Sequence, residues 1–337
     1  LCYALRLTGE LSLPALRTAV QGFFDRHEAF RTTFESDGQG HTFRSPGPVD
    51  LPDRDLASLS PSERERSITA LLTEEVETPF DLVAAPPARV HLVTEAADRH
   101  LLVFTAHHIA CDGLSAQQLF LDLAMLYDGA RRGEPADLPP ASPIGLCVER
   151  SGQPGARDQA AAALGYWRDV FQGGVPVLDL PTDAPRPGLR TFRGDRQTQP
   201  VARGLSSSIR EAARAQGVTL VSFLFATFSA LLHRLSGQTD VVIGLPTSIR
   251  ADDEDTLVGH ATTMLPVRVG FGPETTFADH LRGTVTTLLD AQDHRHHTLG
   301  ALVRELNLRR DPSRPPLVAV TLNVDRGRRP PEMPGLD

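Results

Sequence analysis

The sequence predicts an α+β fold divided into two lobes. Strand and helix patterns are mixed in both halves without a strict strand–helix–strand alternation. The length of 337 residues is sufficient for two hydrophobic cores. A proline-rich stretch at residues 181–187 is typical of a rigid extended segment. We therefore expect an N-terminal lobe at residues 1–175 and a C-terminal lobe at residues 176–337.

The N-terminal lobe is expected to begin with a short strand from Cys2 to Leu7. Pro14 then opens an amphipathic helix, because apolar residues recur at intervals of three and four. A polar helix is predicted over 61–77, and alternating strands over 88–94 and 101–106. Between residues 135 and 155 the pattern fades into Pro, Gly and Ser, and a short helix over 159–171 follows.

The C-terminal lobe is expected to contain four helices and three strands. The helices are predicted over 206–216, 219–235, 277–296 and 299–307, and the strands over 240–244, 263–269 and 317–324. The most apolar stretch runs from Val218 to Leu232, but Thr and Ser interrupt it and His233 and Arg234 follow. We interpret it as a buried helix, because it is too short and too polar to cross a bilayer.

The composition excludes several classes of function. The chain has 34 Lys+Arg against 42 Asp+Glu, a net charge of −8 that argues against binding of a nucleic-acid backbone. Every basic residue is arginine, which excludes a Schiff-base or pyridoxal-phosphate lysine and a Walker phosphate loop.

The cysteines indicate the compartment. Cys2, Cys111 and Cys147 match no zinc pattern and cannot form a closed disulfide framework, so we expect a reducing, cytoplasmic location. No basic-then-apolar leader begins the chain, and no membrane contact is expected. Because the sequence starts at Leu1 without methionine and ends at Asp337 in a Pro-rich run, we expect it to be part of a longer protein.

The most informative segment is residues 101–113, where an apolar strand ends in His107 and His108. Side chains alternate along a strand, so we expect His107 to pack into the lobe and His108 to be open. Asp112 and Gly113 precede a helix, whose backbone amides can stabilise negative charge. Ser115 with the Gln three residues later predicts a capping box for that helix.

The residue types of this segment favour acyl transfer. A neutral imidazole can take a proton from an attacking amine or hydroxyl. No Gly-x-Ser-x-Gly motif competes, and we interpret Cys111 as a small packing residue. An isolated His-His pair is more often core or surface than catalytic. Adjacent histidines on opposite faces do not bind one metal ion together and Asp112 lacks partners nearby, so no metal site is expected.

Six segments in order resemble the condensation domains of nonribosomal peptide synthetases. Residues 107–113 match the family's HHxxxDG motif completely, and residues 26–34 resemble its RHExLRTxF segment. The remaining similar stretches are Pro79–Leu82 with Arg89, Tyr166-Trp167 with Leu180–Asp183 and Pro185–Pro187, Asp240–Pro246, and Arg310–Leu317.

Other segments depart from the family pattern. Residues 259–268 read GHATTMLPVR where the family has GxFVNTxxxR, and Leu114 replaces its usual Trp. The Gly-His and Leu-Pro elements, with Asn323-Val324-Asp325, resemble a subgroup found in hybrid polyketide–peptide lines. The resemblance also implies that the family's first motif and its closing latch lie outside this sequence.

The resemblance implies two chloramphenicol-acetyltransferase-like lobes that form a V-shaped pseudo-dimer. It implies an acyltransferase that forms an amide bond in antibiotic or other secondary-metabolite biosynthesis. Its partners would be upstream and downstream carrier domains and a neighbouring adenylation domain. The substrates would arrive on the phosphopantetheine arms of the carriers, with no cofactor or metal bound directly.

The resemblance also assigns residue roles. His108 would position or deprotonate the α-amine of the acceptor, and His107 would be structural. Gly113 would let the substrate approach the backbone, and its N–H would donate to the oxyanion. Alternatively, Gly113 would be a plain turn glycine. Asp112 should be ion-paired, with Arg250 and Arg31 as rival partners, because a buried carboxylate without a cation is costly.

Two alternative functions stay open. An epimerization domain shares the two-histidine motif but acts on a single thioester, and residues 310–317 favour condensation over it. A non-catalytic domain that docks carriers is the other, and the intact His108 and Asp112 argue against it. Heterocyclization domains carry aspartate at the start of the motif, which this chain does not. We interpret the acidic run Asp252–Asp255 as a solvated loop and residues 294–297 as a solvated helix end.

Overall fold

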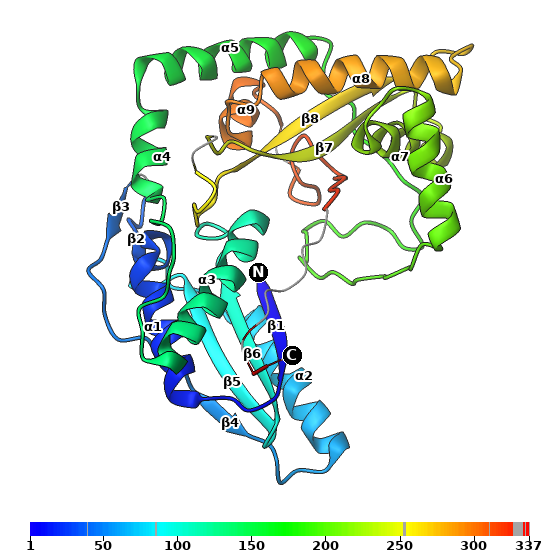
Figure 1. The fold of residues 1–337 in the computed structure, drawn as a ribbon. Coiled ribbons are helices and arrows are strands. Elements are labelled where there is room, and N and C mark those ends of the chain that lie inside the picture. Colours follow the sequence, from blue (N-terminus) through cyan, green and yellow to red (C-terminus); the bar gives the residue numbers. More distant parts are fainter. Residues whose placement is uncertain are drawn as a thin grey trace. The chain divides into compact units, whose positions relative to one another are not determined.

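The structure is a computed structural model that describes residues 1–38, 40–84, 86–251, 254–309, 311–325, 333, 335 and 336. The chain divides into two compact units (Figure 1). Unit 1 contains Leu1–Ser151, Arg250–Ala261 and the described residues from 333 onward. Unit 2 contains Gly152–Ile249 and the described residues of 262–325. Each unit is of the expected mixed α and β type.

A four-stranded sheet forms the centre of unit 1. Its order is β1 (Cys2–Thr8), β6 (Arg99–Ala106), β5 (Ala88–Ala96) and β4 (Asp53–Asp55). Strand β6 pairs antiparallel with both β1 and β5, and β4 pairs parallel with β5. Because β6 is hydrogen-bonded along both edges, its carboxyl end, where the histidine motif begins, has a fixed position.

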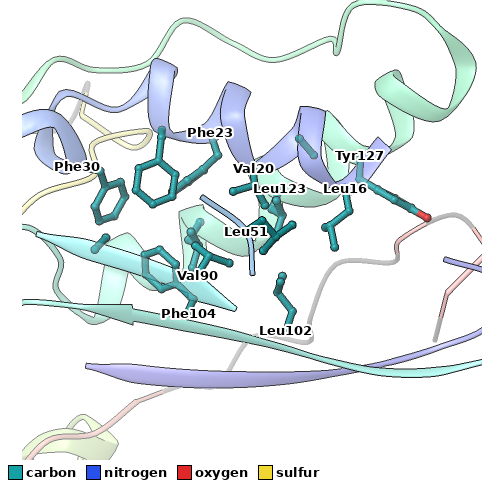
Figure 2. Close-up of a cluster of buried hydrophobic side chains, with 14 of the residues drawn as sticks. Leu16, Val20, Phe23, Phe30, Leu51, Val90, Leu102, Phe104, Leu123 and Tyr127 are labelled. Atoms are coloured by element: carbon teal, nitrogen blue, oxygen red, sulfur yellow. The ribbon is translucent and has the colours of Figure 1, made fainter. Parts of the chain in front are cut away.

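Helices cover both faces of this sheet. On one face α1 (Leu13–Arg26) and α3 (Gly113–Arg132) pack on side chains that include Leu102 and Phe104 (Figure 2). On the other face α2 (Pro61–Glu77) packs its Leu71 against Leu101 and Val103. Successive residues of β6 therefore point to opposite, equally buried faces, which explains why this strand is a continuous apolar run.

The amphipathic pattern of α1 produces the main core of unit 1. The Ser12 side chain caps the helix by accepting a hydrogen bond from the Ala15 N–H. Phe23, on the buried face, lies 5.2 Å from the ring of Phe30, which in turn meets Phe104 edge-on at 5.5 Å. Burial of each such ring contributes about 2 kcal/mol.

Several short elements of unit 1 have no periodic signal in the sequence. These are the 3₁₀ helix η1 (Glu28–Arg31), the antiparallel pair β2 (Thr32–Phe34) and β3 (His41–Phe43), and α4 (Ile144–Ser151). Helix α4 forms within the segment where the sequence pattern fades, so that segment is not wholly irregular. Elements of three to eight residues are too short for apolar spacing to identify them.

Unit 2 is built on the antiparallel pair β7 (Asp240–Ser248) and β8 (Thr262–Gly270). Its helices are α5 (Pro154–Val170), α6 (Arg203–Ala215), α7 (Leu220–Ser236), α8 (Phe277–Asp293) and α9 (Leu299–Glu305). Buried side chains from both strands and from four of these helices form one core, among them Trp167, Phe225, Ile243, Leu265, Ala291 and Leu302. Helices α6 to α9 and the two strands confirm elements predicted for the C-terminal half, whereas α5 corresponds to the helix predicted at the end of the N-terminal half.

The third predicted strand, over 317–324, is wrong as a regular strand. The backbone of Gly244 donates to the Val320 carbonyl and accepts from the Leu322 N–H, and the structure describes only an isolated parallel bridge between Gly244 and Thr321. A Cβ on Gly244 would lie 2.6 Å from Val318 Cγ1, so glycine allows this close approach.

The chain first passes from unit 1 to unit 2 after Ser151. The sequence pattern placed the boundary between the lobes later, at residue 175. Helix α5 explains the difference. Its Trp167 is only 1% exposed, packs in the core of unit 2 and donates its indole N–H to the His294 carbonyl at 3.0 Å. Composition alone does not indicate which core a short helix joins.

Two clusters expected to be solvated are partly buried. Asp252 and Asp253 lie outside the described residues, but Glu254 is 6% exposed and forms an ion pair with Arg150. His297 is also 6% exposed, and its backbone carbonyl accepts from the Thr263 hydroxyl. Both expectations are wrong at these positions, because a partner from a distant part of the chain covers each residue.

Among the helices that the structure describes, none is by itself both long enough and apolar enough to span a membrane. Helices α6 and α7 reach these limits only as a pair bent by 103°. Phe225 and Leu232 of α7 pack into the core of unit 2, in agreement with the buried helix predicted there.

Candidate active site

The two histidines lie in a turn, not on the strand. Strand β6 ends at Ala106, and the Ala110 N–H donates to the His107 carbonyl at 3.0 Å, which closes a turn before α3. The prediction that His107 and His108 point to opposite faces of a strand is therefore wrong, because neither residue belongs to the strand. The turn itself separates them, since His107 is half-buried and His108 is exposed.

His107 supports the turn. Its Nδ1 accepts a hydrogen bond from the Ile109 N–H at 3.1 Å, and its ring meets Phe80 edge-on with centroids 6.1 Å apart. Burial lowers the pKa of His107, so the ring is neutral at pH 7 and can act as this acceptor.

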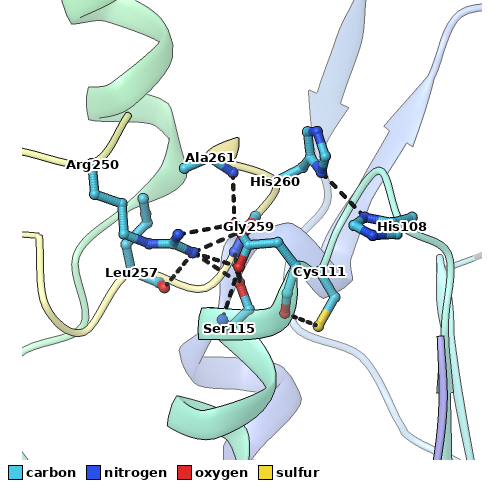
Figure 3. Close-up of polar contacts among 9 residues, drawn as sticks. His108, Cys111, Ser115, Arg250, Leu257, Gly259, His260 and Ala261 are labelled. Carbon is cyan, nitrogen blue, oxygen red and sulfur yellow. Dashed lines mark hydrogen bonds and ion pairs between the residues drawn. The ribbon is translucent and has the colours of Figure 1, made fainter. Parts of the chain in front are cut away.

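His108 makes a single side-chain hydrogen bond within the part of the chain that the structure describes. Its Nδ1 lies 3.2 Å from Nδ1 of His260, and the two rings are nearly perpendicular at 77° (Figure 3). The Nε2 of His108 has no hydrogen-bond partner among the described residues. This nitrogen is therefore available to a ligand.

A buried ion pair stands behind this turn. Arg250 Nη1 and Nη2 donate to the two carboxylate oxygens of Asp112 at 2.9 and 2.8 Å. The side chains are 8% and 2% exposed. Asp112 also accepts from the backbone N–H groups of Ser115, at 2.9 Å, and Ala261, at 3.1 Å. Burial alone would raise the pKa of Asp112, but the hydrogen bonds and charge of Arg250, with Ser115, hold it well below the ordinary value.

Of the two arginines considered for Asp112, only Arg250 lies at the site. Arg31 belongs to η1, where its Nη1 donates to the Arg44 carbonyl. Its Nε is buried without a hydrogen-bond partner in the described residues.

The capping box predicted from Ser115 and Gln118 is wrong. Asp112 is the N-cap of α3, and Ser115 occupies the third helical position. Gln118 instead donates to Asp122 on the same helix at 2.6 Å. The carboxylate at residue 112 therefore has two local tasks, because it caps α3 and binds Arg250.

Ser115 and the segment 257–261 are site components that sequence reasoning missed. The Ser115 hydroxyl lies 2.8 Å from both Asp112 Oδ1 and the Gly259 carbonyl, and it accepts from the Gly259 N–H at 3.0 Å. Its side chain is fully buried. This network fixes His260, which follows Gly259, against the turn that carries His108. The only available signal was the departure from the family pattern at residues 259–263.

Gly113 is the first residue of α3 and faces open space. A Cβ at this position would meet no described atom within 4 Å, and its φ angle is not positive. The local fold therefore does not require glycine here, so the simple turn-glycine interpretation has no support in the backbone. Cys111, by contrast, is fully buried, and burial followed by the Asp112 charge raises the pKa of its thiol to about 12. This thiol is not a nucleophile at neutral pH.

Comparison with known proteins gives consistent results over almost the whole chain. The family model of the condensation domain matches residues 2–327. Phosphinothricin tripeptide synthetase PhsC of Streptomyces viridochromogenes is 34% identical over 331 residues, which cover 96% of this chain and 30% of that protein. Tyrocidine synthase 3 of Brevibacillus parabrevis is 34% identical over 315 residues, which cover 92% of this chain and 5% of that protein.

A solved structure supports the same assignment of fold. The X-domain from teicoplanin biosynthesis matches with a TM-score of 0.85 and 27% identity, covering 100% of this chain and 76% of that chain. This match confirms the expected chloramphenicol-acetyltransferase-like α+β fold. The chain spans less than a third of the two curated relatives. The hybrid polyketide–peptide subgroup stays a prediction.

Proposed function

The chain belongs to the condensation-domain family, and we propose from this premise that it joins two carrier-bound substrates by an amide bond. Condensation domains of nonribosomal peptide synthetases are acyltransferases of this type. The observation that carries the proposal for this chain is the exposed His108 imidazole. Its Nε2 is open, and the turn that holds it is fixed by the buried pair of Asp112 and Arg250.

The proposed reaction needs one proton acceptor. The acceptor α-amine attacks the carbonyl carbon of the donor thioester, a C–N bond forms, and the C–S bond breaks. The amine loses a proton, which Nε2 of His108 takes and then returns to the departing thiolate. A neutral imidazole is suited to both steps near pH 7.

Asp112 is not suited to be the base. Its pKa lies well below the ordinary value, and its two oxygens already accept hydrogen bonds from Arg250, Ser115 and Ala261. We assign it to holding the turn and capping α3.

The amino end of α3 supplies the electrostatic part of the proposal. Gly113 is the first helical residue, and the space beside it is open. Backbone N–H groups at a helix start favour negative charge, which develops on the thioester oxygen during the attack. We therefore assign the N–H of Gly113 to the oxyanion, and the half-buried His107 to supporting the turn.

The partners follow from the proposed reaction. Both substrates would be thioesters on the phosphopantetheine arms of an upstream and a downstream carrier domain, with an adenylation domain nearby to load one of them. The names of the relatives are those of peptide synthetases, including a tyrocidine synthase. We accordingly propose a role in peptide antibiotic or other secondary-metabolite biosynthesis, in the cytoplasm.

The experiment compares His108→Ala with wild type in the full synthetase in its native host, where the carriers hold their own substrates. Mass spectrometry of the phosphopantetheine arms identifies what each carrier holds. We expect condensed product on the downstream carrier of wild type and unjoined donor and acceptor in the variant. His41→Ala is the matched control, because His41 is exposed on β3 of the same unit and outside the site.

Condensed product in the His108→Ala synthetase at the wild-type level would overturn the proposal. Loss of α-deuterium from a single bound aminoacyl thioester, without any joined product, would favour epimerization. Carriers that bind the wild-type domain without any transfer would favour a docking role.

A further inference from the structure

We infer that His260 is a positioning residue that sets the proton arrangement of His108, and this inference rests on the function proposed above. It would act through a hydrogen bond between the two Nδ1 atoms. His260 itself would not contact the reacting amine. None of the motifs that identify the family assigns a task to this position, which falls in the segment where this chain departs from the family pattern.

The contact is direct and is held from both sides. The two Nδ1 atoms are 3.2 Å apart, within hydrogen-bond range for two imidazoles. The turn with His108 ends at Asp112, and the segment with His260 is bonded to Ser115 through Gly259 and to Asp112 through Ala261. The same buried network therefore holds the two backbone segments that carry these rings (Figure 3).

Two neutral imidazoles can form this contact in only two ways, because one Nδ1 must carry a proton and the other must offer a lone pair. If His260 donates, His108 carries its own proton on Nε2 and cannot accept another there. If His108 donates, its Nε2 has a free lone pair. Only the second arrangement lets His108 take the proton of the attacking amine.

The protonated state favours this same arrangement. Once Nε2 of His108 accepts a proton, both of its nitrogens carry hydrogen, and Nδ1–H needs an acceptor. The Nδ1 lone pair of His260 is the acceptor 3.2 Å away. A hydrogen bond from a charged donor is about twice as strong as a neutral one. His260 thus stabilises the imidazolium that the reaction forms, and His108 holds the proton until it returns it to the departing thiolate.

His260 is suited to accept because it is neutral. The residue as a whole is exposed, but partial burial of its ring, followed by the charge of His108, lowers its pKa, while the Asp112 charge and a hydrogen bond to the His108 backbone oppose this shift without reversing it. The charged residues close by are already paired, since Asp112 and Arg250 bind each other. No other described side chain is hydrogen-bonded to the His108 ring.

Three substitutions at His260 separate hydrogen bonding from packing. In Asn, Oδ1 is as many bonds from the backbone as Nδ1 is in His, so His260→Asn keeps an acceptor near the right place. His260→Phe keeps a ring of similar size without any nitrogen, and His260→Ala removes both. The measurement is the single-turnover rate of amide formation in the full synthetase, after the carriers have been loaded with their own substrates.

We expect His260→Ala and His260→Phe to slow the transfer about 10- to 100-fold, the range for losing a hydrogen bond to a charged group. His260→Asn should stay within about threefold of wild type, and His41→Asn and His41→Phe should have no effect. A packing role would give the reverse order, with Phe active and Asn slow. That order, or a wild-type rate for His260→Ala, would overturn the inference.

The same assay keeps this inference apart from the proposed function. If His108→Ala still forms the amide at the wild-type rate, the proposed function fails. If His108→Ala is inactive but the three His260 variants react at the wild-type rate, only the role of His260 fails.

Discussion

Arg250→Met is the most direct test of how the site is built, because it removes the cation from a buried pair and keeps an apolar side chain of similar length. Arg250 and Asp112 are 8% and 2% exposed and share two hydrogen bonds. Removing one partner of a buried ion pair costs about 3–5 kcal/mol. Asp112 would keep its bonds from Ser115 and Ala261, so we expect the lower end, about 3 kcal/mol.

The assay is urea unfolding followed by far-ultraviolet circular dichroism, at pH 7 and at pH 5. Arg54→Met is the matched control in the same unit, because Arg54 and Glu74 form an ion pair at 3.5 Å with both side chains about half exposed. We expect this control to lose at most about 1 kcal/mol. Asp112→Asn combined with Arg250→Met should lose less than Arg250→Met alone, since no charge is left buried.

The pH dependence gives a second reading of the same variant. In wild type the pKa of Asp112 lies so low that the carboxylate stays charged at both pH values. Without Arg250, burial, which acts most strongly on this carboxyl, is opposed only by the bonds from Ser115 and Ala261. We therefore expect the pKa of Asp112 to rise above its value in the unfolded chain, so that the folded state takes up more protons as the pH falls. The loss in free energy of unfolding of Arg250→Met relative to wild type should therefore be smaller at pH 5 than at pH 7. If Arg250→Met loses no more free energy of unfolding at pH 7 than Arg54→Met does, the assigned cost of leaving Asp112 buried without a cation is refuted.

Three further outcomes are expected. Burial lowers the pKa of His280, so the unfolded chain binds more protons than the folded one below pH 6.5. The free energy of unfolding should therefore fall from pH 7 to pH 5. Urea unfolding of His280→Asn should show a weaker fall over the same pH range. Cys111 should react with iodoacetamide at pH 8 at least about 100-fold more slowly than Cys2 in the folded chain, as followed by peptide mass spectrometry, and equal rates would contradict its burial. Gly244→Ala should lower the free energy of unfolding by about 1–3 kcal/mol, because the new Cβ would press on Val318. Gly283→Ala in α8 should raise it by about 0.5–1 kcal/mol, because the new Cβ meets open space. Calorimetry of both variants checks this difference in sign.

The sequence identified the long elements well because their apolar residues recur with a clear period. Helix α2 was predicted with its observed bounds, and α1 was predicted from the spacing of its buried residues. The three-residue strands and α4 were missed, because a few residues cannot establish a period. The extended stretch near Thr321 resembles a strand in composition, yet it forms only one isolated bridge to the described strands, at Gly244, and no continuous ladder.

The site was predictable in kind but not in its partners. The motif indicated that Asp112 needs an arginine, but the choice of Arg250 depends on a contact between residues 138 positions apart. The Ser-x-x-Gln pattern suggested a capping box that Asp112 replaces, because a carboxylate three residues earlier already occupies the cap. The departure from the family pattern at residues 259–263 marks the segment of His260 as unusual, but it does not show that Ser115 and His260 belong to the site, since that follows only from the tertiary contacts.

Trp167 is the only tryptophan of the chain, so its intrinsic fluorescence reports on one place in the molecule. Trp167 is sealed in the core of unit 2, and two of the three tyrosines, Tyr3 and Tyr127, belong to unit 1. Light emitted on excitation at 295 nm therefore follows the melting of unit 2 alone, while the dichroism of the peptide bonds follows the whole chain. Superimposed curves from the two signals would mean that the molecule melts as one cooperative body, and separated curves would reveal two.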